Sequence, residues 1–105
     1  MDNQIRDLTE LELKRALSDS NGKLAIYFYT PMCGTCKLAE RMLHIAMQAG
    51  ETIPIYKINV NFAPWFVRKW EIKSIPCLML FSNQSPIHTM FAINSVQEIY
   101  QEIKK

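Results

Sequence analysis

The chain lacks the long apolar runs that mark a membrane span or a secretory leader. No stretch of the sequence approaches the roughly 20 apolar residues that a membrane-spanning helix requires. The N-terminal segment 1–6 leads directly into an amphipathic pattern and does not have the apolar centre of a signal peptide. We therefore expect a cytoplasmic protein, in a compartment where thiols are kept reduced, with no membrane partner.

The chain also lacks a large excess of charge of either sign. Twelve lysines and arginines stand against ten acidic residues, and the basic residues are scattered apart from Lys104-Lys105. No basic stripe alternates with aromatic residues, which argues against nucleic acid as a partner. A hydrophobic content of 49% suits a globular chain, and 105 residues suit one domain over 1–105, for which a monomer is the default expectation.

Cysteine is limited to three residues, so the thiols cannot all pair within one chain. That count is not typical of a secreted domain stapled by disulfides. Two of the three form Cys33-Gly34-Thr35-Cys36. In a reducing compartment this spacing is more typical of redox or metal chemistry than of a structural bridge, although a permanent structural disulfide is an alternative.

Apolar periodicity predicts an α/β fold in the order β-α-β-α-β-α-β-β-α. Strands are predicted over 5–8, 24–29, 53–60, 78–81 and 87–91, and helices after Thr9, at the Cys-x-x-Cys pair, over 64–70 and after Ser95. Glu12 and Glu98 complete capping boxes with Thr9 and Ser95, Asn61 is placed to cap the helix over 64–70, and a turn is predicted over 83–86. The alternating start implies parallel strands and the short last turn an antiparallel hairpin, giving a central mixed sheet flanked by helices.

The Cys-x-x-Cys pair falls where the strand over 24–29 gives way to a helix. Free N–H groups and the dipole at a helix N-terminus favour an anion, which can lower a thiol pKa from about 8.5 toward about 7. We expect Cys33 to be the exposed nucleophile. Cys36, one turn further into the helix, is placed to attack a mixed disulfide formed on Cys33, and Gly34 keeps the approach open.

A zinc site is the alternative interpretation of this pair. Structural zinc needs about four ligands, and the other candidates, Cys77, His44 and His88, are singly placed, so we expect no metal. Cys77 itself is either a small buried residue or a third redox thiol. The proline before it, Pro76, cannot donate to a sheet ladder and by itself is typical of a strand entry.

Taken together, these segments resemble the thioredoxin family over essentially the whole chain. The resemblance lies in Tyr27-Phe28-Tyr29, Cys33-Gly34-Thr35-Cys36-Lys37, Lys57-Ile58-Asn59-Val60-Asn61, Trp70-Glu71-Ile72 and Ile75-Pro76. It implies a thioredoxin fold and an oxidoreductase that reduces protein disulfides through a Cys33/Cys36 dithiol–disulfide cycle, without a cofactor. It also implies a part in electron transport and cell redox homeostasis, with an NADPH-dependent thioredoxin reductase or a low-molecular-weight thiol as the electron donor.

The resemblance further implies a substrate-binding surface. The residue that matches Pro76 is a cis proline facing the two sulfurs, and the one that matches Ile75 offers backbone hydrogen bonds to an extended substrate segment. The surface implied in this way consists of Met32, Gly34, Thr35, Ser74, Ile75, Pro76, Phe91 and Ala92.

Several residues depart from the family pattern. Met32 and Thr35 replace its usual tryptophan and proline, and loss of the proline frees a backbone N–H near the thiolate. We therefore expect a potential less reducing than the about −270 mV of thioredoxin. Tyr27 replaces a buried aspartate that accepts a proton from the second cysteine. A tyrosine with a pKa of about 10 is a poor base, so we expect deprotonation of Cys36 to rely on water or on Lys57.

Two alternatives follow from Tyr27. The side chain could simply fill the core, or its presence could mark a binding module that keeps the fold with little turnover.

Overall fold

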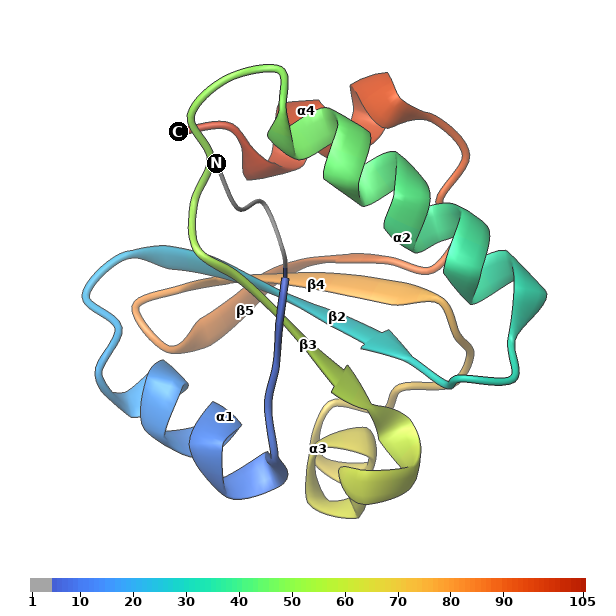
Figure 1. The fold of residues 1–105 in the computed structure, drawn as a ribbon. Coiled ribbons are helices and arrows are strands. Elements are labelled where there is room, and N and C mark those ends of the chain that lie inside the picture. Colours follow the sequence, from blue (N-terminus) through green and yellow to red (C-terminus); the bar gives the residue numbers. More distant parts are fainter. Residues whose placement is uncertain (1–4) are drawn as a thin grey trace.

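The structure is a computed structural model and describes residues 5–105 (Figure 1). Its elements are β1 (Arg6–Asp7), α1 (Glu10–Ser18), β2 (Lys23–Tyr29), α2 (Gly34–Met47), β3 (Ile55–Asn59), the 3-10 turn η1 (Val60–Phe62), α3 (Pro64–Lys69), β4 (Cys77–Ser82), β5 (Ser85–Met90) and α4 (Val96–Ile103). Apart from the added η1, this is the predicted order.

One five-stranded sheet in the order β1-β3-β2-β4-β5 organises the chain. β1, β3 and β2 run parallel, whereas β4 and β5 are antiparallel to their neighbours, so the sheet is mixed as predicted. β2 is the central strand, and its residues from Leu24 to Phe28 are buried on both faces. Helices α2 and α4 cover one face and α1 and α3 the other (Figure 1).

Side-chain caps fix the start of two helices where the sequence predicts them. Thr9 and Glu12 form a reciprocal capping box at α1, with hydrogen bonds of 2.9 and 3.1 Å. The Ser95 hydroxyl oxygen accepts from the Glu98 amide at 3.0 Å and opens α4. The capping box predicted there is not completed, because the Glu98 carboxylate accepts from the Ser95 hydroxyl at 3.3 Å instead of from the Ser95 amide. Each cap satisfies a backbone donor that the helix itself leaves unpaired.

The expectation that Asn61 caps α3 is wrong. Ala63 occupies the N-cap position, and the Asn61 amide donates to the Asn59 side chain within η1. The donors at the start of α3 are instead satisfied by a carboxylate from α1, because Glu10 Oε2 accepts from the amides of Trp65 at 2.9 Å and Phe66 at 3.1 Å. A cap supplied from 55 residues away leaves no local signal in the sequence.

The last hairpin is tighter than the predicted turn over 83–86. Asn83 and Gln84 alone form the turn, both with positive φ, at 49° and 74°. Such a backbone matches the twist of the flanking strands, which favours two-residue hairpin loops. Ser85 and Pro86 therefore already belong to β5, an edge strand of the sheet, where a proline is tolerated.

Candidate functional site

Cys33 is the N-cap residue of α2. Its backbone is extended, and its Sγ accepts a hydrogen bond from the Cys36 amide at 3.1 Å, as an oxygen does in an ordinary N-cap. The hydroxyl of Thr35 lies 3.3 Å from the same sulfur. Cys33 is partly exposed while Cys36 is buried, and both are free thiols. The structure thus places the two sulfurs as the sequence predicts, one accessible and the other beneath the first turn.

The pKa values of the two thiols are shifted in opposite directions. The pKa of Cys33 is lowered, first by hydrogen bonding with the Cys36 side chain and then by the Thr35 hydroxyl and nearby backbone amides. Burial, followed by the hydrogen bond with Cys33, raises the pKa of Cys36 to about 11. Because the thiolate is the reactive form of cysteine, the partly exposed Cys33 is the better suited of the two thiols to act as a nucleophile.

Tyr27 lies fully buried beneath this turn. Its hydroxyl donates to the Cys36 carbonyl oxygen at 2.5 Å, and its ring stacks on that of Tyr29 with the planes 5° apart. Burial in particular raises the pKa of Tyr27 above its ordinary value, so this side chain is a hydrogen-bond donor and not a base. The tyrosine both fills the core and holds the helix turn that carries Cys36.

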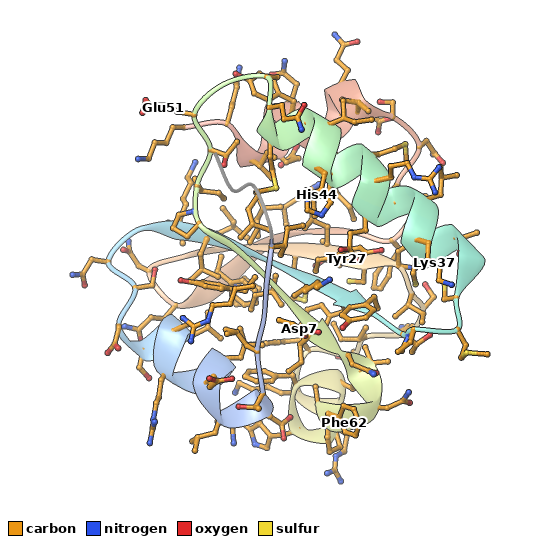
Figure 2. The ribbon with its side chains drawn as sticks, viewed as in Figure 1. Asp7, Tyr27, Lys37, His44, Glu51 and Phe62 are labelled. Carbon is orange, nitrogen blue, oxygen red and sulfur yellow. The ribbon has the colours of Figure 1, made fainter. Side chains whose placement is uncertain are left out.

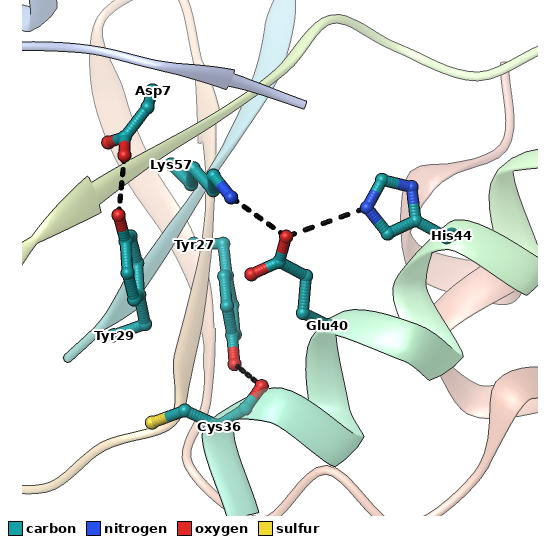
Figure 3. A network of polar contacts seen from close by, with 7 residues as sticks. All are labelled: Asp7, Tyr27, Tyr29, Cys36, Glu40, His44 and Lys57. Atoms are coloured by element: carbon teal, nitrogen blue, oxygen red, sulfur yellow. Dashed lines mark hydrogen bonds and ion pairs between the residues drawn. The ribbon is translucent and has the colours of Figure 1, made fainter. Parts of the chain in front are cut away.

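Lys57 points to an acid on α2 and not to the Cys36 sulfur (Figure 3). The Lys57 Nζ atom lies 2.8 Å from Glu40 Oε2 and 5.3 Å from the centre of the Tyr29 ring. The same Glu40 oxygen is 3.5 Å from His44 Nε2. In the part of the chain that the structure describes, no hydrogen bond joins Lys57 to Cys36. Glu40 was not predicted as part of the site. Its one sequence signal is its place four residues after Cys36, on the same side of a helix.

Pro76 comes to the same end of the sheet as the cysteine pair. Phe28, near the end of β2, pairs with Cys77 at the start of the antiparallel β4. Pro76, which precedes Cys77, therefore lies at the end of β2 from which the chain continues to Cys33. The Ile75–Pro76 peptide bond is cis, as the resemblance implies. Pro76 and Ile75 are partly exposed.

The other residues of the predicted substrate surface reach solvent. Met32 is 94% exposed and Phe91 37%, and Gly34, Thr35, Ser74 and Ala92 are also exposed. Apart from its chain neighbours and its own helix, a methyl group added at Gly34 would meet no atom within 4 Å, so Gly34 faces open space. Beside Ile75, a small cavity of about 240 Å³ is lined by Val60, Val67, Ile72, Lys73, Ser74 and Ile75.

Cys77 directly follows Pro76 and is buried in the core, and the two histidines contact acidic residues on helices. Burial raises the pKa of Cys77 to about 12. His88 is 4.0 Å from Glu102 on α4, and His44 contacts Glu40 on α2; Figure 2 shows His44 on that helix. Among residues 5–105, no three His, Cys, Asp or Glu side chains gather in a way that could hold a metal ion. None of the helices in this range is long and apolar enough to cross a membrane.

Comparisons with known proteins give one family. The thioredoxin family model matches residues 4–105. The thioredoxin-like protein YusE of Bacillus subtilis is 35% identical over 101 residues, which cover 96% of this chain and 92% of that protein. Mitochondrial thioredoxin 3 from Saccharomyces cerevisiae, in its oxidised form, superimposes with a TM-score of 0.79 at 28% identity, over 94% of this chain and 92% of the yeast chain.

A second solved structure is equally similar. It concerns the thiol-resolving mechanism of the yeast mitochondrial 1-Cys peroxiredoxin via glutathione and thioredoxin systems. Its matching chain has a TM-score of 0.80 at 27% identity, with 95% of this chain and 93% of that chain covered.

Proposed function

Because this chain belongs to the thioredoxin family and is a thiol–disulfide oxidoreductase, we propose that it reduces protein disulfides with Cys33 as nucleophile and Cys36 as resolving thiol. The observation that carries this assignment is the unequal setting of the two sulfurs. Cys33 is partly exposed and accepts a hydrogen bond at a helix start, whereas Cys36 is buried and has a raised pKa.

The proposed cycle has two exchange steps. The Cys33 thiolate attacks one sulfur of the substrate disulfide, which forms a Cys33–substrate disulfide and releases the other substrate sulfur as a thiolate. Cys36 then loses its proton and attacks Cys33 Sγ, which releases the second substrate thiolate and leaves the Cys33–Cys36 disulfide. The two electrons gained by the substrate are those given up by the two cysteines.

The second step needs an acceptor for the Cys36 proton. Tyr27 is unsuited, because its hydroxyl is already a donor and its pKa is raised. We assign the proton to solvent or, through solvent, to the Lys57–Glu40 pair, of which Glu40 stands on the same helix one turn after Cys36 and Lys57 stands on β3. Burial of Cys36 makes this deprotonation the slower of the two steps.

The substrate is proposed to lie across the apolar residues that surround Cys33. Met32 and Phe91 offer exposed apolar surface, and Gly34 faces open space and carries no side chain that would obstruct a substrate. An extended segment would pair with the backbone at Ile75, next to Pro76, as a short added strand. The proposed electron donor is a NADPH-dependent thioredoxin reductase or a low-molecular-weight thiol, and the proposed compartment is the cytoplasm, with a monomer as the working form.

Insulin reduction tests this function. The protein is assayed with NADPH and thioredoxin reductase, and in parallel with glutathione, NADPH and glutathione reductase. We expect turnover with one donor, none with Cys33→Ser, and a stable mixed disulfide between insulin and Cys33 in Cys36→Ser. Absence of turnover with both donors would overturn the enzymatic proposal, and a complex with insulin under those conditions would favour a binding module.

A further inference from the structure

Thr35 brings its hydroxyl to the reacting sulfur. It is the second residue of α2, and its Oγ1 lies 3.3 Å from Cys33 Sγ, where either atom is able to donate while Cys33 is a thiol. Once Cys33 is ionised its sulfur has no proton left to give. The hydrogen bond then has a single direction, from Thr35 to the thiolate.

We propose that Thr35 is a catalytic residue whose hydroxyl donates a hydrogen bond to the Cys33 thiolate and so stabilises the reduced form of the pair. This inference rests on the proposed function in taking Cys33 as the nucleophile. It assigns to the side chain of Thr35 an effect separate from that of its backbone N–H. The Cys36 amide at 3.1 Å is the second donor, so the thiolate is held from two sides.

The step that this contact affects is exchange at Cys33. When the Cys33–Cys36 disulfide reacts with two molecules of glutathione, the products are the dithiol and one glutathione disulfide. A donor that favours the thiolate stabilises the dithiol side of this equilibrium and also improves Cys33 as a leaving group from a mixed disulfide. The same donor reduces the nucleophilicity of the thiolate, since nucleophilicity falls with pKa.

The chain offers a clean pair of variants at this position. Thr35→Val keeps the β-branched shape and the backbone N–H but removes the hydroxyl, whereas Thr35→Ser keeps the hydroxyl. Thr35 is exposed, so neither change opens a buried cavity. The comparison therefore separates the hydroxyl from the backbone effect that follows from loss of the usual proline.

The test measures two quantities over a range of pH. The first is the rate at which iodoacetamide alkylates Cys33, which reports the thiolate fraction. The second is the equilibrium constant with glutathione. Thr35→Val loses a hydrogen bond to a charged group, and we expect this loss to raise the pKa of Cys33 by about one unit. At pH values where Cys33 is ionised, the equilibrium constant is expected to fall about tenfold, which corresponds to a potential about 30 mV more negative.

The pH dependence distinguishes this role from a structural one. The difference between Thr35→Val and the unmodified protein should vanish at pH values where Cys33 is protonated in both, and Thr35→Ser should follow the unmodified protein throughout. A difference that is constant with pH, no difference at all, or a Thr35→Ser variant that behaves like Thr35→Val would overturn the proposal. Alkylation needs no turnover, so it reports on Thr35 even if insulin reduction fails.

Discussion

The Sγ atom of Cys33 accepts a hydrogen bond from the Cys36 amide at 3.1 Å, so the proposed nucleophile caps the helix that carries the proposed resolving thiol. The chemistry and the local stability of α2 therefore depend on the same atom. When Cys33 enters a disulfide with a substrate, its sulfur loses the negative charge that makes it a good acceptor.

Removal of this cap should cost stability. We expect Cys33→Ala to lower the free energy of unfolding by about 1 kcal/mol relative to Cys33→Ser, because serine is a preferred N-cap residue and alanine is not. Urea unfolding of the two variants under reducing conditions measures the difference. Both lack the nucleophile, so equal stabilities would show that the cap contributes nothing.

The three thiols should react in a fixed order. At pH 8, iodoacetamide is expected to modify Cys33 alone in the folded protein, because burial raises the pKa values of Cys36 and Cys77 to about 11 and about 12 and keeps both protonated. Mass spectrometry after digestion locates the label, and labelling in denaturant serves as the control for all three sites. Modification of Cys77 in the folded protein would instead support a third redox thiol.

Replacement of Tyr27 by the aspartate that the family usually has at this position should strongly destabilise the fold. Tyr27→Phe removes one hydrogen bond and is expected to cost about 1 kcal/mol, since the helix offers the Cys36 carbonyl a second partner. Tyr27→Asp leaves a cavity and a buried carboxyl group, and we expect it to cost about 3–5 kcal/mol or more. Unfolding in urea measures both, and a Tyr27→Asp variant as stable as Tyr27→Phe would contradict the packing described here.

The Lys57–Glu40 pair should stabilise the fold measurably but weakly. Its side chains are 20% and 23% exposed, so a double-mutant cycle with Lys57→Met and Glu40→Gln is expected to give a coupling of about 0.5–1 kcal/mol. The matched control is the Arg6–Glu12 pair, at 3.7 Å and largely exposed, for which we expect a coupling near zero. Equal couplings would mean that burial does not strengthen the pair.

The sequence predicts most of this architecture because the main signals are local. The continuous apolar segment at Leu24–Tyr29 identifies the central strand, and the Thr9–Glu12 and Ser95–Glu98 spacings locate two helix starts to the residue. The Cys33–Cys36 spacing after that strand gives the site. In each case, the residues that decide the structure are close together in the chain.

The features that were missed depend on residues far apart in the sequence. Glu40 meets Lys57 across 17 residues, and Glu10 meets Phe66 across 56. No periodicity reports such pairs, since they arise only when α2 lies over β3 or when α1 and α3 share a face of the sheet. The contact between Thr35 and Cys33 is local but depends on a rotamer, which a residue pattern does not contain.

The carboxylate of Glu10 connects α1 to the start of α3. It accepts hydrogen bonds from the first amides of α3, the helix that precedes the segment with Ile75 and Pro76, so the first turn of α1 holds a helix next to the proposed substrate-binding surface. We therefore expect a change at Glu10 to loosen the start of α3 while it leaves the Cys33 and Cys36 sulfurs in place, and so to affect the proposed substrate binding before it affects the exchange chemistry.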